Sequence, residues 1–226
     1  MVDAGSVLRE KSIRTRERIL TAAEKLFAEQ GFDGASMRGI TASAKVNLSV
    51  AYYYFKDKET LLHSVLDRYL LPVMEEMRGL LAAAREAAGT APIPLRRLLD
   101  AMVLPRARCL SDTAHRLFTL LFVHRGETEK KIFATLEEKV EPLQRMFLDE
   151  FSRTLPHLSE LELRFRMESL DVMLYGWRTV GPLKEHRYPK TVPIETFLEM
   201  LMTFAEPLFL APATLSLKKR PEARSR

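Results

Sequence analysis

The stretch that decides the fold is S-M-R-G-I-T-A-S-A-K-V-N-L-S-V-A-Y-Y-Y-F, residues 36–55. Ser36 can cap a helix of about eight residues that ends near Ala44, and Asn47 can cap a second helix of similar length. Two short helices joined by so tight a connection predict a helix-turn-helix unit. Such helices are too short to be stable alone in water, so we expect them to pack on a longer one.

A longer amphipathic helix precedes this unit. Gly31 stands where a left-handed C-terminal cap is expected, and Phe32 can then fold back towards Phe27. The basic residues between positions 9 and 18 are too polar for a core, and they form either a solvated face or an arm that grasps a nucleic-acid backbone. The helix itself is indicated by apolar residues at the spacing of one helical stripe: Ile19, Ala22, Ala23, Leu26 and Phe27.

The second short helix carries three consecutive tyrosines, Tyr52, Tyr53 and Tyr54. Around a helix they point in directions about 100° apart, so at least one must face outwards. Small residues precede them, and each hydroxyl can bond a phosphate oxygen, which suits a surface that faces a DNA groove. The alternative is that the tyrosines are core aromatics, as Phe55 is expected to be.

Asp57 is expected to cap the next helix, which places Lys58 in the first turn of that helix. The helix dipole disfavours a cation there by a few tenths to about 1 kcal/mol. The placement is explained if an anion docks at the helix start, held by the free N–H groups and the ammonium together.

Two segments, R-E-R-I-L-T-A-A-E-K-L-F-A-E-Q-G-F (residues 16–32) and residues 36–61, carry a family resemblance. Over about residues 14–62 the chain resembles the DNA-binding head of the TetR family of transcriptional regulators. The resemblance implies that Arg38 reaches base edges, while Tyr54 and Lys58 contact phosphates. The full DNA-binding set that it implies is Ser36, Arg38, Leu48, Ser49, Val50, Tyr52, Tyr53, Tyr54 and Lys58.

Two residues depart from the family pattern. Lys45 and Ser49 stand where the family usually has glycine. If the backbone at Lys45 is left-handed, a lysine there costs on the order of 1 kcal/mol. Both departures affect the expected tilt of the recognition helix.

Beyond residue 58 only helical stripes recur, so the predicted fold is all-α: a three-helix head followed by a helical-bundle body. The stretch A-A-G-T-A-P-I-P, residues 87–94, is the expected loop, and Pro72 should kink or interrupt the helix before it. Four prolines should bound the last helix: Pro182, Pro189, Pro193 and Pro207. The predicted domains are a DNA-binding head (1–57), a ligand-binding and dimerisation body (58–210) and a basic, flexible tail (211–226).

The body is expected to bind a second copy and a small molecule. The resemblance implies that the last two long helices pair across a homodimer, and the segments 161–179 and 194–210 are apolar over more than one stripe. Eight of the ten methionines and nine of the twelve phenylalanines lie beyond residue 58, which suits an adaptable cavity for an apolar or amphipathic effector, although core packing explains most of them. The candidate ligand contacts are Phe118, Phe122, Met173, Trp177 and Arg178.

Other function classes find little support in the 226 residues. The five histidines lack metal-site spacing, no catalytic or nucleotide-binding motif is present, and the single cysteine, Cys109, excludes a disulfide framework. We therefore expect no enzyme, metal or cofactor, no membrane span or secretory signal, and a cytoplasmic setting. The function expected is a ligand-responsive repressor that binds a near-palindromic DNA operator as a homodimer. An activator of the same fold is the alternative, and a helical enzyme or an interaction adaptor is the less favoured one.

Overall fold

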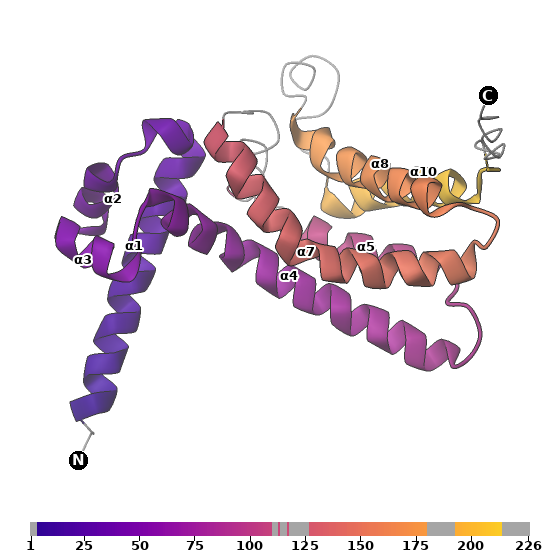
Figure 1. The fold of residues 1–226 in the computed structure, drawn as a ribbon, viewed down its shortest axis with the longest axis horizontal. Helices are drawn as coiled ribbons and strands as arrows, with labels where there is room; N and C mark the ends of the chain where they lie inside the picture. Colours follow the sequence, from indigo (N-terminus) through magenta and orange to yellow (C-terminus); the bar gives the residue numbers. More distant parts are fainter. Residues whose placement is uncertain (1–3, 110–112, 114–116, 118–126, 180–192, 214–226) are drawn as a thin grey trace, which may run out of the picture. The chain divides into compact units, whose positions relative to one another are not determined.

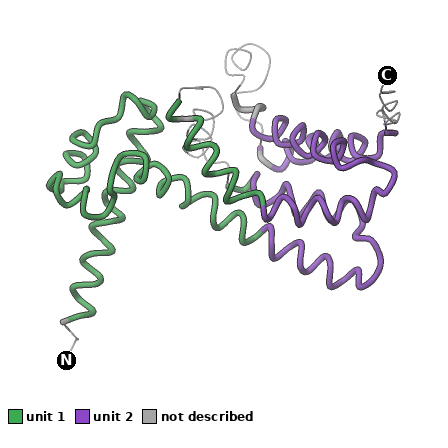
Figure 2. Tube along the Cα trace, in the orientation of Figure 1, with its two compact units in different colours: residues 1–76, 108–141 green, residues 77–107, 142–226 purple. Residues whose placement is uncertain are grey.

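A computed structural model describes residues 4–109, 113, 117, 127–179 and 193–213. These residues contain eight helices, shown in Figure 1, and no strand. The chain forms two compact units, coloured in Figure 2: residues 1–76 with 108–141, and residues 77–107 with 142–226. The predicted all-α class is confirmed. The predicted division at residue 57 concerns function and stays a prediction.

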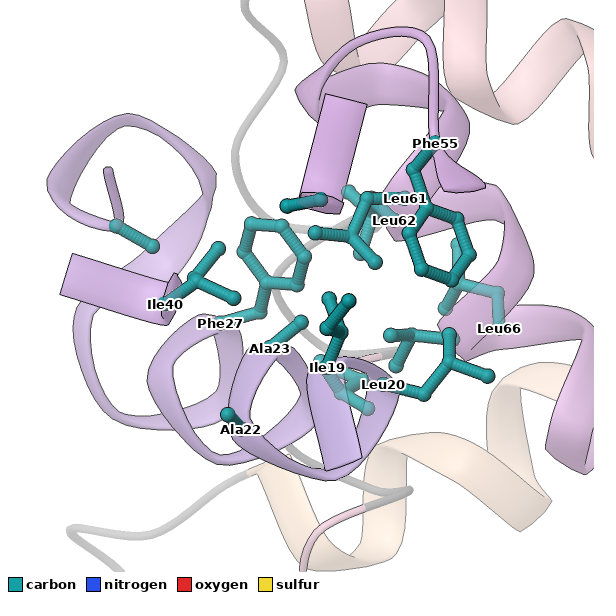
Figure 3. Packing of buried hydrophobic residues seen from close by; sticks show 14 of the residues in the cluster. Ile19, Leu20, Ala22, Ala23, Phe27, Ile40, Phe55, Leu61, Leu62 and Leu66 are labelled. Atoms are coloured by element: carbon teal, nitrogen blue, oxygen red, sulfur yellow. The ribbon is translucent and has the colours of Figure 1, made fainter. Parts of the chain in front are cut away.

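The first unit contains the head, which is built from α1 (Ala4–Gly34), α2 (Met37–Ala44), α3 (Leu48–Tyr54) and the start of α4 (Lys58–Ala88). Its core is a single apolar cluster to which all four helices contribute. In Figure 3 the side chains of Phe27, Phe55 and Leu61 point into this cluster. The predicted stripe of α1 supplies one wall, because Ile19, Ala23 and Phe27 are buried. Ala51 and Phe55 are buried as expected, so packing on α1 is what stabilises the seven-residue α3.

Helix α1 is longer than the apolar stripe that predicted it, because it begins at Ala4. Gly31 has the expected positive φ of 73°, but its ψ of 179° is extended and lies outside the left-handed helical region. The expected contact after it is present, since the rings of Phe27 and Phe32 stack with 6.0 Å between centroids.

The second unit contains the rest of α4, most of α5 (Leu95–Cys109), the end of α7 (Glu127–Thr154), α8 (Glu160–Thr179) and α10 (Ile194–Leu210). The predicted loop is confirmed between α4 and α5 over residues 89–94, whereas Ala87 and Ala88 belong to α4. Helices α8 and α10 lie side by side. Arg166 of α8 is buried and donates hydrogen bonds to four carbonyl oxygens at the end of α10 and just beyond it, those of Leu208, Phe209, Ala211 and Pro212, at 2.8–3.1 Å.

Pro72 was expected to kink or interrupt its helix and Pro207 to bound one, but both lie inside helices. Helix α4 continues through Pro72, and α10 continues through Pro207 to Leu210. An internal proline costs about 3 kcal/mol. In α10 the fully buried Ala205 and Phe209 on either side of Pro207 offset this cost.

The apolar residues of α8 divide between two opposite faces. The predicted stripe placed Leu161 and Phe165 together with Leu170 and Leu174, but Leu161 and Phe165 are 61% and 66% exposed. At 100° per residue they share their face with Val172, which is also exposed. The buried stripe runs along the other side of the helix through Leu163, Met167, Leu170 and Leu174.

Candidate nucleic-acid interface

The turn between α2 and α3 is held by backbone geometry and one arginine. The Ser36 hydroxyl caps α2 by accepting a hydrogen bond from the Gly39 N–H at 3.0 Å, as predicted. At the other end, Lys45 adopts φ 54° and ψ 48°, so the left-handed conformation considered for this lysine is present. The Lys45 N–H bonds the Ala42 carbonyl oxygen and the Val46 N–H bonds the Thr41 carbonyl oxygen, which closes α2.

The Asn47 side chain makes no capping hydrogen bond, contrary to the prediction, although its backbone occupies the N-cap position with φ −73° and ψ 149°. Its carbonyl oxygen instead accepts the first hydrogen bonds of α3, from Val50 at 3.0 Å and Ala51 at 3.3 Å. The start of α3 therefore depends on the backbone of the turn and on the burial of Ala51.

Arg18 joins the turn to α1. Its guanidinium donates hydrogen bonds to the carbonyl oxygens of Ala44 (2.5 Å) and Lys45 (2.9 Å). The guanidinium of Arg16 lies 5.2 Å from the centroid of the Phe55 ring, over the end of α3. These contacts were not found from the sequence, which left the basic residues near α1 as a solvated face or an arm.

Helix α3 presents its polar and aromatic residues to solvent. Tyr52 and Tyr53 are 47% and 83% exposed, and Ser49 is exposed beside them. Leu48 and Val50 are half-buried. Ser36 and Arg38 on the neighbouring helix are exposed, so the structure brings most of the predicted DNA-binding residues to accessible positions on α2 and α3.

Tyr54 has a different environment. It is half-buried, its hydroxyl is 2.8 Å from the Ser12 hydroxyl of α1, and its ring meets that of Tyr53 edge-on at 5.2 Å. Tyr54 also borders an open hollow of about 500 Å³ between α1, the turn and α3. The hollow is lined by Thr15, Thr41, Ala42, Lys45, Val46, Asn47, Val50 and Tyr54.

Lys58 has a structural function that the sequence did not suggest. Its ammonium donates hydrogen bonds to the carbonyl oxygens of Phe32 (2.8 Å) and Ala35 (3.1 Å), and lies 4.2 Å from the centroid of the Phe32 ring. An ammonium has three N–H donors, so one remains for an anion. Lys58 therefore connects the start of α4 to the segment between α1 and α2.

Asp57 caps α4 as predicted, because its carboxylate accepts a hydrogen bond from the Thr60 N–H at 2.7 Å. This bond lowers the pKa of Asp57 below its usual value. The cap therefore stabilises the fold above the ordinary pKa of an aspartate, and the stabilisation is lost as the pH falls through the lowered pKa.

The candidate ligand contacts in the body are only partly described. Met173 is half-buried on α8, whereas Phe118, Phe122 and the side chains of Trp177 and Arg178 lie outside the described residues. A buried charge appears where the sequence did not predict one, because Arg106 of α5 forms an ion pair with Asp171 of α8. Only the three-dimensional packing of α5 on α8 reveals this pair.

Comparison with known families matches residues 19–65 to the model described as bacterial regulatory proteins, tetR family. The matched segment covers α2, α3 and the buried stripe of α1. The chain carries a TetR-family helix-turn-helix domain. In this domain the turn between α2 and α3 is closed by the left-handed Lys45 and by the hydrogen bonds from Arg18.

Curated relatives are transcriptional regulators that match mainly through this domain. The repressor NicS of Pseudomonas putida is 45% identical over 58 residues, which are 26% of this chain and 27% of NicS. The regulator UidR of Escherichia coli is 27% identical over 119 residues, 46% of this chain and 61% of UidR. The chain thus spans less than two thirds of the length of either relative.

Solved structures show the same fold over most of the chain. The structure of SmeT in complex with triclosan has a TM-score of 0.62 and 19% identity, and covers 92% of this chain and 99% of that one. Within the described ranges, no helix has the length and apolar character needed to cross a membrane.

Proposed function

We propose that the protein is a homodimeric transcriptional regulator, a repressor that a small molecule releases from a near-palindromic DNA operator. The main support is the match of residues 19–65 to the tetR family, over a domain that exposes Ser49, Tyr52 and Tyr53 on α3. NicS is named a repressor, and this favours repression over activation. The DNA-binding head by itself does not distinguish a repressor from an activator.

The proposed homodimer is supported by the apolar surface of the second unit. Helix α8 exposes Leu161, Phe165 and Val172 along one face, and α10 exposes Met200 and Phe204. Large apolar side chains exposed along a helix face often mark an interface. A two-fold dimer presents two recognition helices to two half-sites, which is the reason for proposing a near-palindromic operator.

The proposed effector is a small apolar or amphipathic molecule. SmeT, which shares the fold, was solved in complex with the small molecule triclosan. An effector acts only through its different affinity for the DNA-bound and free states, and typical coupling is about 1–3 kcal/mol. The candidate contacts in the body remain Phe118, Phe122, Met173, Trp177 and Arg178.

Selection of bound duplexes from a random DNA pool tests this function. We expect the purified protein to enrich sequences with two related half-sites whose centres are about 10 base pairs, or a multiple of that, apart. Mass spectrometry of molecules that co-purify with the protein identifies effector candidates. A protein that retains no duplex at low salt, with or without those candidates, contradicts the proposal.

The Arg38→Ala variant, put through the same selection, tests whether Arg38 contacts a base. Because Arg38 is exposed on α2, we expect the variant to lose the preference at one position in each half-site and to keep the others. Equal weakening on every sequence would instead assign Arg38 to the DNA backbone.

The Phe165→Asp variant tests the proposed dimer. A two-fold interface receives two carboxylates from one substitution, and their desolvation costs several kcal/mol. We expect the variant to run at the 25.9 kDa mass of one chain in size-exclusion chromatography with light scattering, and to lose operator binding.

Ala83→Asp adds the same charge to an exposed position of α4, and it should leave both the mass and the operator binding unchanged. A Phe165→Asp protein that still has the mass of two chains contradicts the placement of the interface on α8.

A further inference from the structure

We propose that the N-terminal part of α1, residues 5–18, is a second DNA-contacting surface, and that it binds the sugar-phosphate backbone beside the half-site read by α3. This inference rests on the proposed function. The segment lies outside the matched family segment of residues 19–65, and yet it continues α1 for about four helical turns. Figure 1 shows it running on from the head to the N-terminus.

The helical period separates the charges of this segment by face. At 100° per residue, Ser12 and Thr15 lie within about 60° of one another, on either side of the direction of Ile19. Arg9 and Lys11 flank these hydroxyls on either side. Both acids of the segment, Glu10 and Glu17, lie on the opposite face. The face that continues towards the head carries the two cations and the two hydroxyls around one exposed apolar side chain, Leu8.

This cationic face is fixed beside the recognition helix. The Ser12 hydroxyl lies 2.8 Å from the Tyr54 hydroxyl of α3, and Thr15 lines the open hollow that Lys45, Asn47 and Val50 also border. The hydroxyls, the lysine and the amide around it are donors of the kind that bond phosphate oxygens. A DNA backbone that passes α3 thus meets donors from the turn and from α1 together.

The cations of the segment differ in what they already bind. Arg18 holds the carbonyls of the turn and Arg16 lies over Phe55, so both have structural partners. Arg14 is on the far face and pairs with Glu10 at 2.5 Å. Arg9 and Lys11 are exposed and form no ion pair among the described residues, which makes them the cations available to phosphates.

The test compares two duplexes: the selected operator trimmed to its half-sites, and the same operator with about ten extra base pairs on each side. We expect the unaltered protein to bind the longer duplex about tenfold more tightly at low salt, and the Arg9→Ala/Lys11→Ala variant to bind both duplexes within about twofold. On the longer duplex, the slope of log affinity against log salt should fall by about 0.9 for each phosphate that the variant no longer neutralises. Alanine favours helix, so circular dichroism should show α1 intact.

The matched control is Arg14→Ala/Lys25→Ala, which removes two exposed cations from the far face of the same helix. It should retain the preference for the longer duplex. The inference is overturned if both double variants show the same preference between the two duplexes. It is also overturned if Arg9→Ala/Lys11→Ala changes the mass of the assembly but not its preference for the longer duplex, because the face then binds a second copy of the chain. If the unaltered protein binds neither duplex, the proposed function fails as well.

Discussion

Replacing the buried Arg166 by methionine is expected to lower the free energy of unfolding by about 3 kcal/mol. The guanidinium donates to four carbonyl oxygens at the end of α10, and methionine fills a similar volume but donates nothing. The buried carbonyl of Phe209 then loses this donor. Urea unfolding at one fixed protein concentration measures the change, since association shifts apparent stability.

Arg164→Ala is the control for this substitution, because Arg164 is two residues away and pairs with Glu160 in an exposed i, i+4 contact at 3.0 Å. We expect it to change the free energy of unfolding by less than about 0.5 kcal/mol. If the free energy of unfolding of Arg166→Met is within about 1 kcal/mol of the original, at about the same slope against urea, the hydrogen bonds from Arg166 to the end of α10 do not have the assigned stabilising effect.

Lys58→Ala is expected to have two separable effects. The loss of two hydrogen bonds from an ammonium and of its interaction with the Phe32 ring should lower the free energy of unfolding by about 2 kcal/mol. If the remaining N–H binds a phosphate, affinity should fall equally on all DNA sequences, and the salt slope should fall by about 0.9 per protomer.

Stability and salt dependence distinguish the two functions of Lys58. If Lys58→Ala is destabilised but its salt slope is unchanged, the result supports the contacts with Phe32 and Ala35 and contradicts the phosphate contact. If the free energy of unfolding is unchanged, the result contradicts a stabilising function of these contacts. Lys56→Ala, two residues earlier and exposed, should leave the free energy of unfolding within about 0.5 kcal/mol.

The local features of the head were predictable because they depend on neighbours in the sequence. The stripe through Ile19 and Phe27, the caps at Ser36 and Asp57, and the burial of Phe55 follow from spacing and side-chain chemistry. Each involves an interaction between residues a few positions apart, or a helical face that has one apolar side.

The features that escaped prediction depend on contacts between distant segments. Arg18 binds carbonyls 26 and 27 positions further along the chain, and Lys58 binds carbonyls 26 and 23 positions earlier. The buried face of α8 was not predicted correctly for another reason. Two opposite faces of this helix carry apolar residues, and periodicity alone does not show which face is buried. Helix propensity predicts a boundary at Pro207 because it takes no account of the packing of Phe209.

The attachment of the turn to α1 through Arg18 bears on how such a protein changes over evolutionary time. Since that arginine grips only main-chain oxygens, the side chains on the outer face of α3 are replaceable without disturbing it. Under the proposed function, the preferred DNA sequence can therefore change through substitutions at Ser49 or Tyr52 without loss of the contacts that attach the turn to α1.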